Sequence, residues 1–373
     1  MRRITFLLTV MLFSQGCGDG GLLGGDYRPD ATGIEGQITV VIDSVLWNGT
    51  VGEALQIHVG GSIETLPSAE PEFDLEAIGL TSSAAFDMAK DRKNVMIVGL
   101  IADSSSENIT TESEYLNTIF SNDSLRQMIL EGSPALVARP NHWRRNQLVY
   151  YLAAASPSDL IMSLEQNSEQ LRYHFNEVSR TRLHRDMFDI GRQHDIEQAL
   201  IEEHQFAVNA QHDYFIAIDT TQFVWLRRSL TDTWRSLFVY YEEEGDPSKL
   251  NADWIARARD ALTQRYISGT AGGWIEIDRR RPMTIQEINF KDRYAIEFRG
   301  LWHMVGEDNG RKFPFGMGGP FVTYAFYDEP TQRLYLIDGM VFAPNFSKRE
   351  FMRQMEVIAY TFRTLQEVEG ESV

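Results

Sequence analysis

Residues 294–365 constrain the fold more than any other stretch, because two apolar strands there precede one amphipathic helix. Val322–Tyr327 and Arg333–Phe342 have strand-like patterns, and Glu329 to Gln332 between them predict a short hairpin connection. Apolar residues lie on both sides of the second strand, which predicts that it is covered on both faces. This unit therefore requires a layer of helix on at least one side of a sheet.

The predicted helix supplies that layer and carries its own start signal. Ser347 and Glu350 have the spacing of a capping box, and Phe346 and Phe351 have that of a hydrophobic staple. The apolar residues of the helix occur at steps of four and three, and they are Phe351, Met355, Ile358, Phe362 and Leu365. Such spacing places them on one face of a helix, which we expect to pack against the preceding strands.

The remaining sequence alternates predicted strands with helices. The pattern predicts an α+β fold with a mixed, largely antiparallel sheet, helices packed on it, and a β-hairpin before the amphipathic C-terminal helix. We divide the body into an N-terminal α+β half, residues 37–209, and a C-terminal α+β half, residues 210–373. One continuous domain is the alternative. Within the second half, Arg299–Trp302 is expected to bend and Gly316–Phe321 to form a glycine turn.

The N-terminus has the features of a targeting segment. Arg2 and Arg3 precede ten apolar residues, Ile4 to Phe13, a run too short to span a bilayer as a helix. Residues 1–16 are therefore interpreted as a signal peptide. Cys17, the single cysteine of the chain, comes next, at the position where bacterial lipoproteins are acylated with chains such as palmitate. An ordinary secretory signal cut nearby is the alternative, because Ser14 and Gln15 depart from the usual residues before the cysteine.

This interpretation makes residues 17–36 a flexible tether, since they are rich in Gly and Asp. The acyl chains would then be the membrane contact of the protein. Loss of residues 1–16 takes the formal net charge from −18 to −20. Nucleic acid is excluded as a partner on this ground, because phosphate binding needs a basic face.

Several common catalytic patterns are absent from the sequence. It has no Gly-x-Ser-x-Gly nucleophile turn, no phosphate-binding Gly-rich Lys motif and no His-Glu-x-x-His. Five histidines recur at spacings of ten and eight, at positions His174, His184, His194, His204 and His212. Ten residues advance a helix by about 1000°, so these side chains spiral around it and do not converge on one metal ion. We therefore expect no catalytic residue, no cofactor and no metal.

Two groups of residues are candidates for binding. Asp338 is a carboxylate on an otherwise apolar strand face, and with Glu297 and Arg299 it is expected to form a buried polar cluster. This cluster is either a structural ion pair or a polar hole in a ligand groove with Trp302 as its wall. Separately, Trp225 lies beside Arg227, and stacked Arg–Trp faces bind sugars or peptides in other proteins, although most such pairs are core edges.

Several short motifs together resemble an uncharacterised family. They include Trp47-Asn-Gly, Arg92-Lys-Asn94, Phe223-Val-Trp225-Leu-Arg227, Arg299-Gly-Leu-Trp302, Gly318-Gly-Pro-Phe321 and Asp338-Gly-Met-Val-Phe-Ala-Pro344. The set is similar to a domain-of-unknown-function family of predicted lipoproteins from Gram-negative bacteria, over about residues 38–365. The resemblance implies a lipid-anchored protein of the cell envelope, on the outer or the inner membrane. It implies no activity and no catalytic residue.

Our leading interpretation is a non-enzymatic envelope lipoprotein that binds or scaffolds a protein or polymer of the envelope. A cell-envelope hydrolase that uses Glu297 and Asp338 as paired carboxylates is one alternative. A small-ligand carrier is another, and it predicts a deep apolar pocket between sheet and helix.

Overall fold

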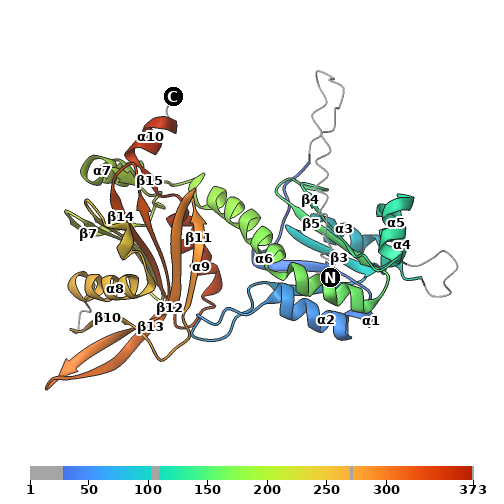
Figure 1. Ribbon diagram of the computed structural model, residues 1–373, viewed down its shortest axis with the longest axis horizontal. Helices are drawn as coiled ribbons and strands as arrows, with labels where there is room; N and C mark the ends of the chain where they lie inside the picture. Colours follow the sequence, from blue (N-terminus) through green and yellow to red (C-terminus); the bar gives the residue numbers. More distant parts are fainter. Residues whose placement is uncertain (1–27, 102–108, 269–271, 372–373) are drawn as a thin grey trace, which may run out of the picture.

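The computed structural model describes residues 28–101, 109–268 and 272–371, which form two lobes side by side (Figure 1). The expected signal peptide and Cys17 lie outside the described residues. The fold is α+β as the sequence predicted, and it ends in a β-hairpin followed by helices. Helices long and apolar enough to cross a membrane are absent from the described part of the chain.

The N-terminal lobe, β1 to α6, is built on a five-stranded sheet of order β2-β1-β3-β5-β4. The first four strands in this order run parallel, and β4 pairs antiparallel with β5. The strands are β1 (Gln37–Val41), β2 (Asp74–Ile78), β3 (Asn94–Leu100), β4 (Ala135–Pro140) and β5 (Leu148–Ala154). The central strands β3 and β5 are almost wholly apolar and buried, as expected of parallel strands that helices cover on both faces.

Helices form the two outer layers of this lobe. Buried residues of α2 and α6 pack on one face of the sheet, and those of α3, α4 and α5 pack on the other. The bounds are α1 (Ser44–Trp47), α2 (Thr50–Leu55), the π-helical turn η1 (Gln56–Gly60), α3 (Ser83–Asp91), α4 (Thr111–Ile119), α5 (Asp123–Leu130) and α6 (Pro157–Phe188).

Part of the expected tether is packed against this lobe. The Ala31 amide donates to the Arg145 carbonyl at 3.0 Å, and the Thr32 amide donates to the Asp91 carbonyl at 2.7 Å. Glu35 is buried, and its carboxylate accepts a hydrogen bond of 2.9 Å from Arg182 on α6. These contacts place residues 30–36 on the surface of the folded body.

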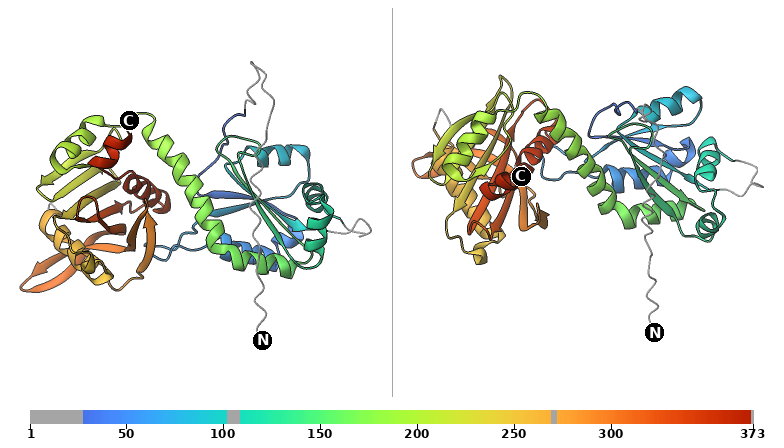
Figure 2. Two further views of the ribbon diagram at one scale, coloured as in Figure 1. Left: turned by 45° about the horizontal axis from the view of Figure 1, so that its top comes forward. Right: turned by 90° about the horizontal axis from the view of Figure 1, so that it is seen from above.

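Helix α6 connects the lobes and is the longest helix described (Figure 2). It begins with Ser156 as its cap and Pro157 in its first turn. With 32 residues it extends about 48 Å. Gly191, with φ of +79°, lies in the break after it, and α7 (His194–His204) then packs into the second lobe through Leu200.

The C-terminal lobe, α7 to α10, is built on an eight-stranded sheet of order β10-β12-β13-β14-β9-β8-β7, with β11 also paired to β12. All of these pairings are antiparallel. The strands are β7 (Phe215–Thr220), β8 (Phe223–Ser229), β9 (Trp234–Glu242), β10 (Trp274–Ile277), β11 (Thr284–Phe290), β12 (Arg293–Asp308), β13 (Arg311–Asp328) and β14 (Arg333–Phe342).

One long helix covers each face of this sheet. Met355 and Ile358 of α9 (Arg349–Tyr360) pack on one face, and Ile255 and Leu262 of α8 (Ala252–Tyr266) pack on the other. The central strand β14 is therefore covered on both sides, as predicted. Small elements complete the lobe, namely β6 (Phe206–Ala207), η2 (Pro247–Lys249), β15 (Arg363–Thr364) and α10 (Leu365–Glu371).

Two local predictions in this lobe are wrong. Arg299–Trp302 does not bend, because β12 continues through it and pairs with β13 on one side. Gly316–Phe321 is part of β13 rather than a turn. Gly316 does have a positive φ, of +65°, and it lies where the register of the two strands shifts. A β-bulge uses this glycine conformation, so the strands continue past it into a projecting hairpin.

The start of α9 also differs from the prediction. Its cap position is Lys348 and no side chain of its own segment closes it. Instead, the Glu70 carboxylate of the N-terminal lobe accepts from the Lys348 amide at 2.8 Å and the Arg349 amide at 3.0 Å. Glu350, the expected partner of Ser347, bonds to the Arg349 guanidinium at 2.9 Å. The first turn of α9 is thus closed by a residue 278 positions earlier.

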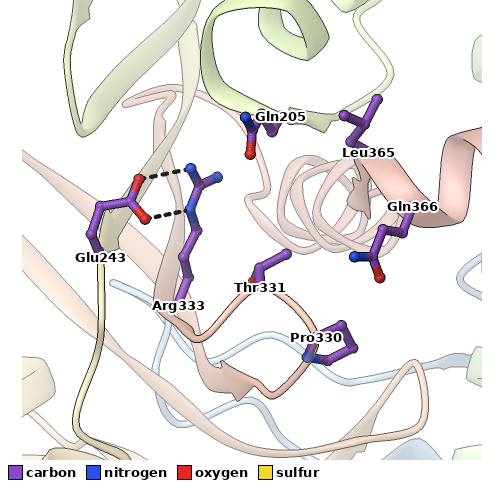
Figure 3. Close-up of a pocket in the computed structure, with 7 residues that line it drawn as sticks. All are labelled: Gln205, Glu243, Pro330, Thr331, Arg333, Leu365 and Gln366. Atoms are coloured by element: carbon purple, nitrogen blue, oxygen red, sulfur yellow. Dashed lines mark hydrogen bonds and ion pairs between the residues drawn. The ribbon is translucent and has the colours of Figure 1, made fainter.

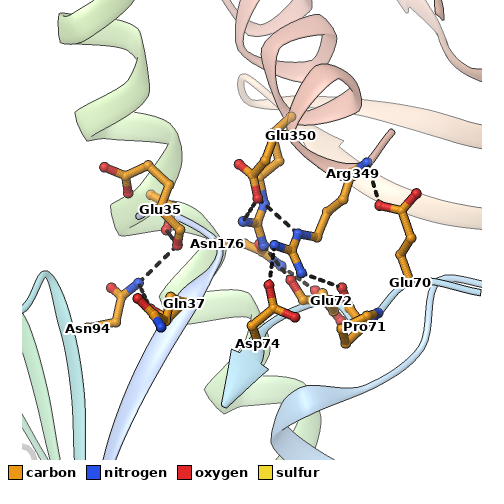
Figure 4. Close-up of polar contacts among 12 residues, drawn as sticks. Glu35, Gln37, Glu70, Pro71, Glu72, Asp74, Asn94, Asn176, Arg349 and Glu350 are labelled. Atoms are coloured by element: carbon orange, nitrogen blue, oxygen red, sulfur yellow. Dashed lines mark hydrogen bonds and ion pairs between the residues drawn. The ribbon is translucent and has the colours of Figure 1, made fainter. Parts of the chain in front are cut away.

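Further contacts join the lobes at the same place (Figure 4). Arg349 donates to Asp74 at 2.8 Å and to the Pro71 carbonyl at 2.9 Å. Arg353, one turn further along α9, donates to the Glu72 carbonyl at 2.7 Å. The interface between the lobes at this place is therefore polar, and α9 supplies its cations.

Candidate functional site

The structure separates the expected polar cluster into two parts on opposite faces of the sheet. Glu297 and Arg299 face α9, where the Arg299 guanidinium donates two hydrogen bonds to Glu297, at 2.6 and 2.7 Å. Its third contact, at 2.6 Å, is with Glu356 of α9. Trp302 and Asp338 lie on the other face, against α8. The reason is the unbroken strand: residues three apart on β12 point to opposite sides.

The Glu297–Arg299–Glu356 group is a partly buried structural ion cluster. Burial raises the pKa of Glu297, but the charge and hydrogen bonds of Arg299 outweigh it and lower the pKa overall. Burial likewise opposes the charge of Arg299, while Glu297 and Glu356 raise its pKa well above the usual value. Both groups are therefore charged and hold α9 to the sheet.

Asp338 is sealed in a second ion pair. It is fully buried and accepts from Arg259 of α8 at 2.7 and 3.4 Å, and from the Thr323 hydroxyl at 2.5 Å. Burial raises the pKa of this carboxyl, and the Arg259 charge counteracts that effect. Because Glu297 is on the far side of the sheet, the two carboxylates do not form a pair for acid–base catalysis. The paired-carboxylate hypothesis is wrong for these residues.

The second candidate pair does join one member of the first. Trp225 and Arg227 of β8 share the α8 face with Trp302 of β12, and Trp234 of β9 lies between them. The ring centroids of Trp234 and Trp302 are 5.2 Å apart. The Arg227 guanidinium carbon lies 5.5 Å from the Trp225 ring and 5.8 Å from the Trp234 ring. We call these four residues the indole cluster.

Hydrogen-bonding groups in this cluster lack partners. Among the described residues, no acceptor is bound to the indole Nε1 atoms of Trp225 and Trp302 or to Nε of Arg227. The Ser236 hydroxyl, which is fully buried beside Arg227 in the sheet register, has no partner there either. Trp225 is 8% exposed and Trp302 1% exposed, so burial of these groups costs about 1–3 kcal/mol each. Other buried groups without a partner occur elsewhere in the described residues, but these four share one face of the sheet.

Sequence reasoning missed Trp234, Ser236 and Arg259. The sequence pattern does indicate the first two, because Trp234, Ser236 and Phe238 alternate along β9 and lie on the same side of the sheet as Trp225. Arg259 was less accessible to prediction, since it is a charged residue on the apolar stripe of a helix.

A polar depression lies elsewhere, at the end of the β13–β14 hairpin (Figure 3). Its volume is about 260 Å³, and its lining includes Gln205, Glu243 and Arg333. Arg333 donates to Glu243 at 2.7 and 3.0 Å and to the His204 carbonyl at 2.6 Å. Burial opposes the charge of Arg333, but Glu243 raises its pKa overall. This cation is already engaged, so the depression is a weak candidate for anion binding.

A neighbouring depression of about 770 Å³ shares Pro330 and Gln366 with it. Both depressions lie apart from the residues that the sequence had singled out. They are open and lined mainly by polar side chains, unlike the deep apolar pocket that a small-ligand carrier would need.

Fold and site together define a two-lobed α+β protein, with a mostly parallel sheet in one lobe and an antiparallel sheet that bears the indole cluster in the other. Two family models match the chain, one for each lobe. Residues 31–188 match a domain of unknown function (DUF8532), and residues 193–361 match another domain of unknown function (DUF4837). Both matches are to domains without an assigned function, and they support the expectation of an uncharacterised family.

The comparison with curated proteins gave no match. Solved structures similar to part of the chain include the Saccharomyces cerevisiae Ran-binding protein Mog1p, at 11% identity and a TM-score of 0.29, covering 43% of this chain and 90% of that one. A mutant of protein Mog1 matches at 12% identity and a TM-score of 0.27, covering 43% and 91%. Similarity at this level supports no conclusion about function.

Proposed function

We propose that this protein is a lipid-anchored component of the bacterial cell envelope that binds a sugar-containing envelope polymer at the indole cluster, without catalysing a reaction. The observation that carries the proposal is the set of unpartnered donors beside aromatic faces: Nε1 of Trp225, Nε1 of Trp302 and Nε of Arg227.

The chemistry of these groups favours a sugar. Indole rings stack on the C–H faces of sugar rings, and N–H groups donate to their hydroxyl and amide oxygens. The protein carries a formal net charge of −18, which disfavours a strongly anionic polymer. Trp234, Arg227 and Phe342 are partly exposed, so they form the accessible edge through which such a ligand would meet Trp302.

The anchor part of the proposal rests on the sequence around Cys17 and can be tested separately. The full-length protein and its Cys17→Ser variant would be expressed in a Gram-negative host and fractionated with and without detergent. We expect the wild-type chain in the membrane fraction and the variant in the soluble fraction. Equal partition of both would refute lipid anchoring.

Binding would be tested by titrating the mature Cys17→Ser chain with soluble peptidoglycan fragments while intrinsic tryptophan fluorescence is recorded. Trp302→Phe keeps the aromatic packing but removes one N–H donor, so we expect the dissociation constant to rise roughly fivefold. Arg227→Met removes a cationic donor and should weaken binding by more than tenfold. The matched control is Trp143→Phe, which removes an indole from the other lobe and should leave affinity unchanged.

Two results would overturn the binding proposal. One is the absence of any saturable change with the fragments at millimolar concentration. The other is wild-type affinity in both Trp302→Phe and Arg227→Met.

A further inference from the structure

A separate part of the C-terminal lobe brings one histidine and two carboxylates together. Glu203 and His204 lie at the end of α7, and Asp219 lies on β7. One potential ligand atom from each lies within 4.8 Å of those of the other two. The closest pair is Nε2 of His204 and Oδ1 of Asp219, at 2.8 Å. This group shares no residue with the indole cluster.

The orientation of the imidazole is fixed by its other nitrogen. Nδ1 of His204 lies 3.1 Å from the Tyr241 hydroxyl oxygen. That hydroxyl donates its single hydrogen to the Thr221 carbonyl, at 2.6 Å. Its oxygen must therefore accept from Nδ1–H. The hydrogen-bond network thus assigns a proton to Nδ1, so Nε2, which faces Asp219, is the nitrogen that is able to bind a metal ion.

Two acceptors at this distance need a cation between them. A lone pair on Nε2 and a carboxylate oxygen repel each other unless a proton or a metal ion is shared. The imidazole is only 2% exposed, whereas Glu203 and Asp219 reach the solvent. A metal ion here would therefore have protein ligands on its inner side and free positions for water on its outer side.

We propose that His204 Nε2, Asp219 and Glu203 bind a first-row divalent transition-metal ion such as zinc. Mixed imidazole and carboxylate ligands suit this class of ion better than calcium or magnesium. A hydrogen bond from the second ring nitrogen, as Tyr241 provides, is the usual support of a metal-binding histidine. The Nε2–Oδ1 separation must open from 2.8 Å to about 3.3 Å for tetrahedral ligation, a small movement for an exposed aspartate.

Sequence reasoning did not find this site. The spacing argument assumed one continuous helix through the histidines, whereas α6 ends at Phe188 and α7 begins at His194. It does not address a single histidine that meets carboxylates from its own helix end and from a strand 15 residues later. The last carbonyl groups of a helix have no partner within the helix. Arg333 donates to the carbonyl of His204 and so helps to fix the position of the His204 side chain.

The test is isothermal titration of the untagged, metal-stripped protein with zinc, together with the visible absorption of its cobalt complex. We expect one equivalent of zinc bound at micromolar concentration and a cobalt spectrum of four- or five-coordinate type. Asp219→Asn should weaken zinc binding more than tenfold, and Tyr241→Phe about tenfold through loss of the support to His204. The matched control is Glu202→Gln, which changes the exposed carboxylate adjacent to Glu203 and should bind as wild type.

Circular dichroism of each variant would show that the lobe is folded. The proposal is overturned if the wild-type protein takes up no stoichiometric zinc at 1 mM, because the contact is then a proton-held ion pair. It is also overturned if folded Asp219→Asn binds zinc as tightly as the wild type.

Discussion

Replacement of Ser236 by alanine should stabilise the C-terminal lobe. The hydroxyl of Ser236 is fully buried in the middle of the sheet, beside Arg227 on one strand and Met340 on the other. It has no hydrogen-bond partner among the described residues. Removing it relieves a desolvation cost of about 1–3 kcal/mol.

The opposing effect is small. The lost oxygen leaves a void of about 20 Å³, which costs about 0.5 kcal/mol at the usual rate for cavities. The net change in the free energy of unfolding should then be a gain of about 0.5–2.5 kcal/mol. Urea unfolding followed by tryptophan fluorescence measures it, because the surrounding indoles report on this lobe.

Thr323→Val is the matched control in the same sheet. Its buried hydroxyl donates to Asp338 at 2.5 Å, so the isosteric replacement removes a satisfied hydrogen bond to a charged acceptor. It should destabilise the lobe by about 1.5–3 kcal/mol. A loss of stability in Ser236→Ala would refute the reasoning that this hydroxyl is unsatisfied. A gain in stability together with weaker sugar binding would be typical of a group retained for function.

The ion pairs and the cap of α9 lead to three further predictions. Asp338→Leu or Arg259→Met alone should lower the free energy of unfolding by about 3–5 kcal/mol, measured with urea, because each leaves a buried unpaired charge. The double variant should recover most of that stability, and additive losses in the double variant would contradict this reasoning. Glu70→Ala should cost about 1 kcal/mol and increase proteolysis at the start of α9, and unchanged cleavage there would contradict the capping role. The pKa of Glu297 is lowered in the folded protein, so its ionised carboxylate contributes its full stabilisation above about pH 4.5 and loses it as the pH falls through the folded pKa. Glu297→Gln should therefore make the free energy of unfolding less dependent on pH in the acid range.

The elements of the C-terminal lobe were largely predictable, because local patterns determine them. Strand β14 and helix α9 could be derived from apolar spacing, but α9 ends at Tyr360, so Phe362 and Leu365 of the predicted stripe lie beyond it. The cap of α9 was not predictable. Ser347 and Glu350 have the right spacing for a local cap, but Glu70 supplies it from a distant lobe, and no local pattern reports such a contact.

The site was predictable only in part, and the error has one physical source. We predicted a bend at Arg299–Trp302 and so did not apply the alternation of a strand there. That alternation places Arg299 and Trp302 on opposite faces of the sheet. The same alternation, applied to β8 and β9, would have placed Trp225 and Trp234 on the same face of the sheet. The pairing partner of a strand depends on the tertiary fold, so the proximity of Trp302 to Trp234 was beyond the sequence alone.

The capping of α9 by Glu70 bears on the order in which the chain matures. During vectorial synthesis Glu70 leaves the ribosome long before Lys348 does, so the N-terminal lobe can be complete when α9 first emerges. The last long helix then docks onto a carboxylate that is already in position. A nascent chain halted before residue 348 would therefore present a finished first lobe and an open second one, which is the stage at which a chaperone would have most to bind.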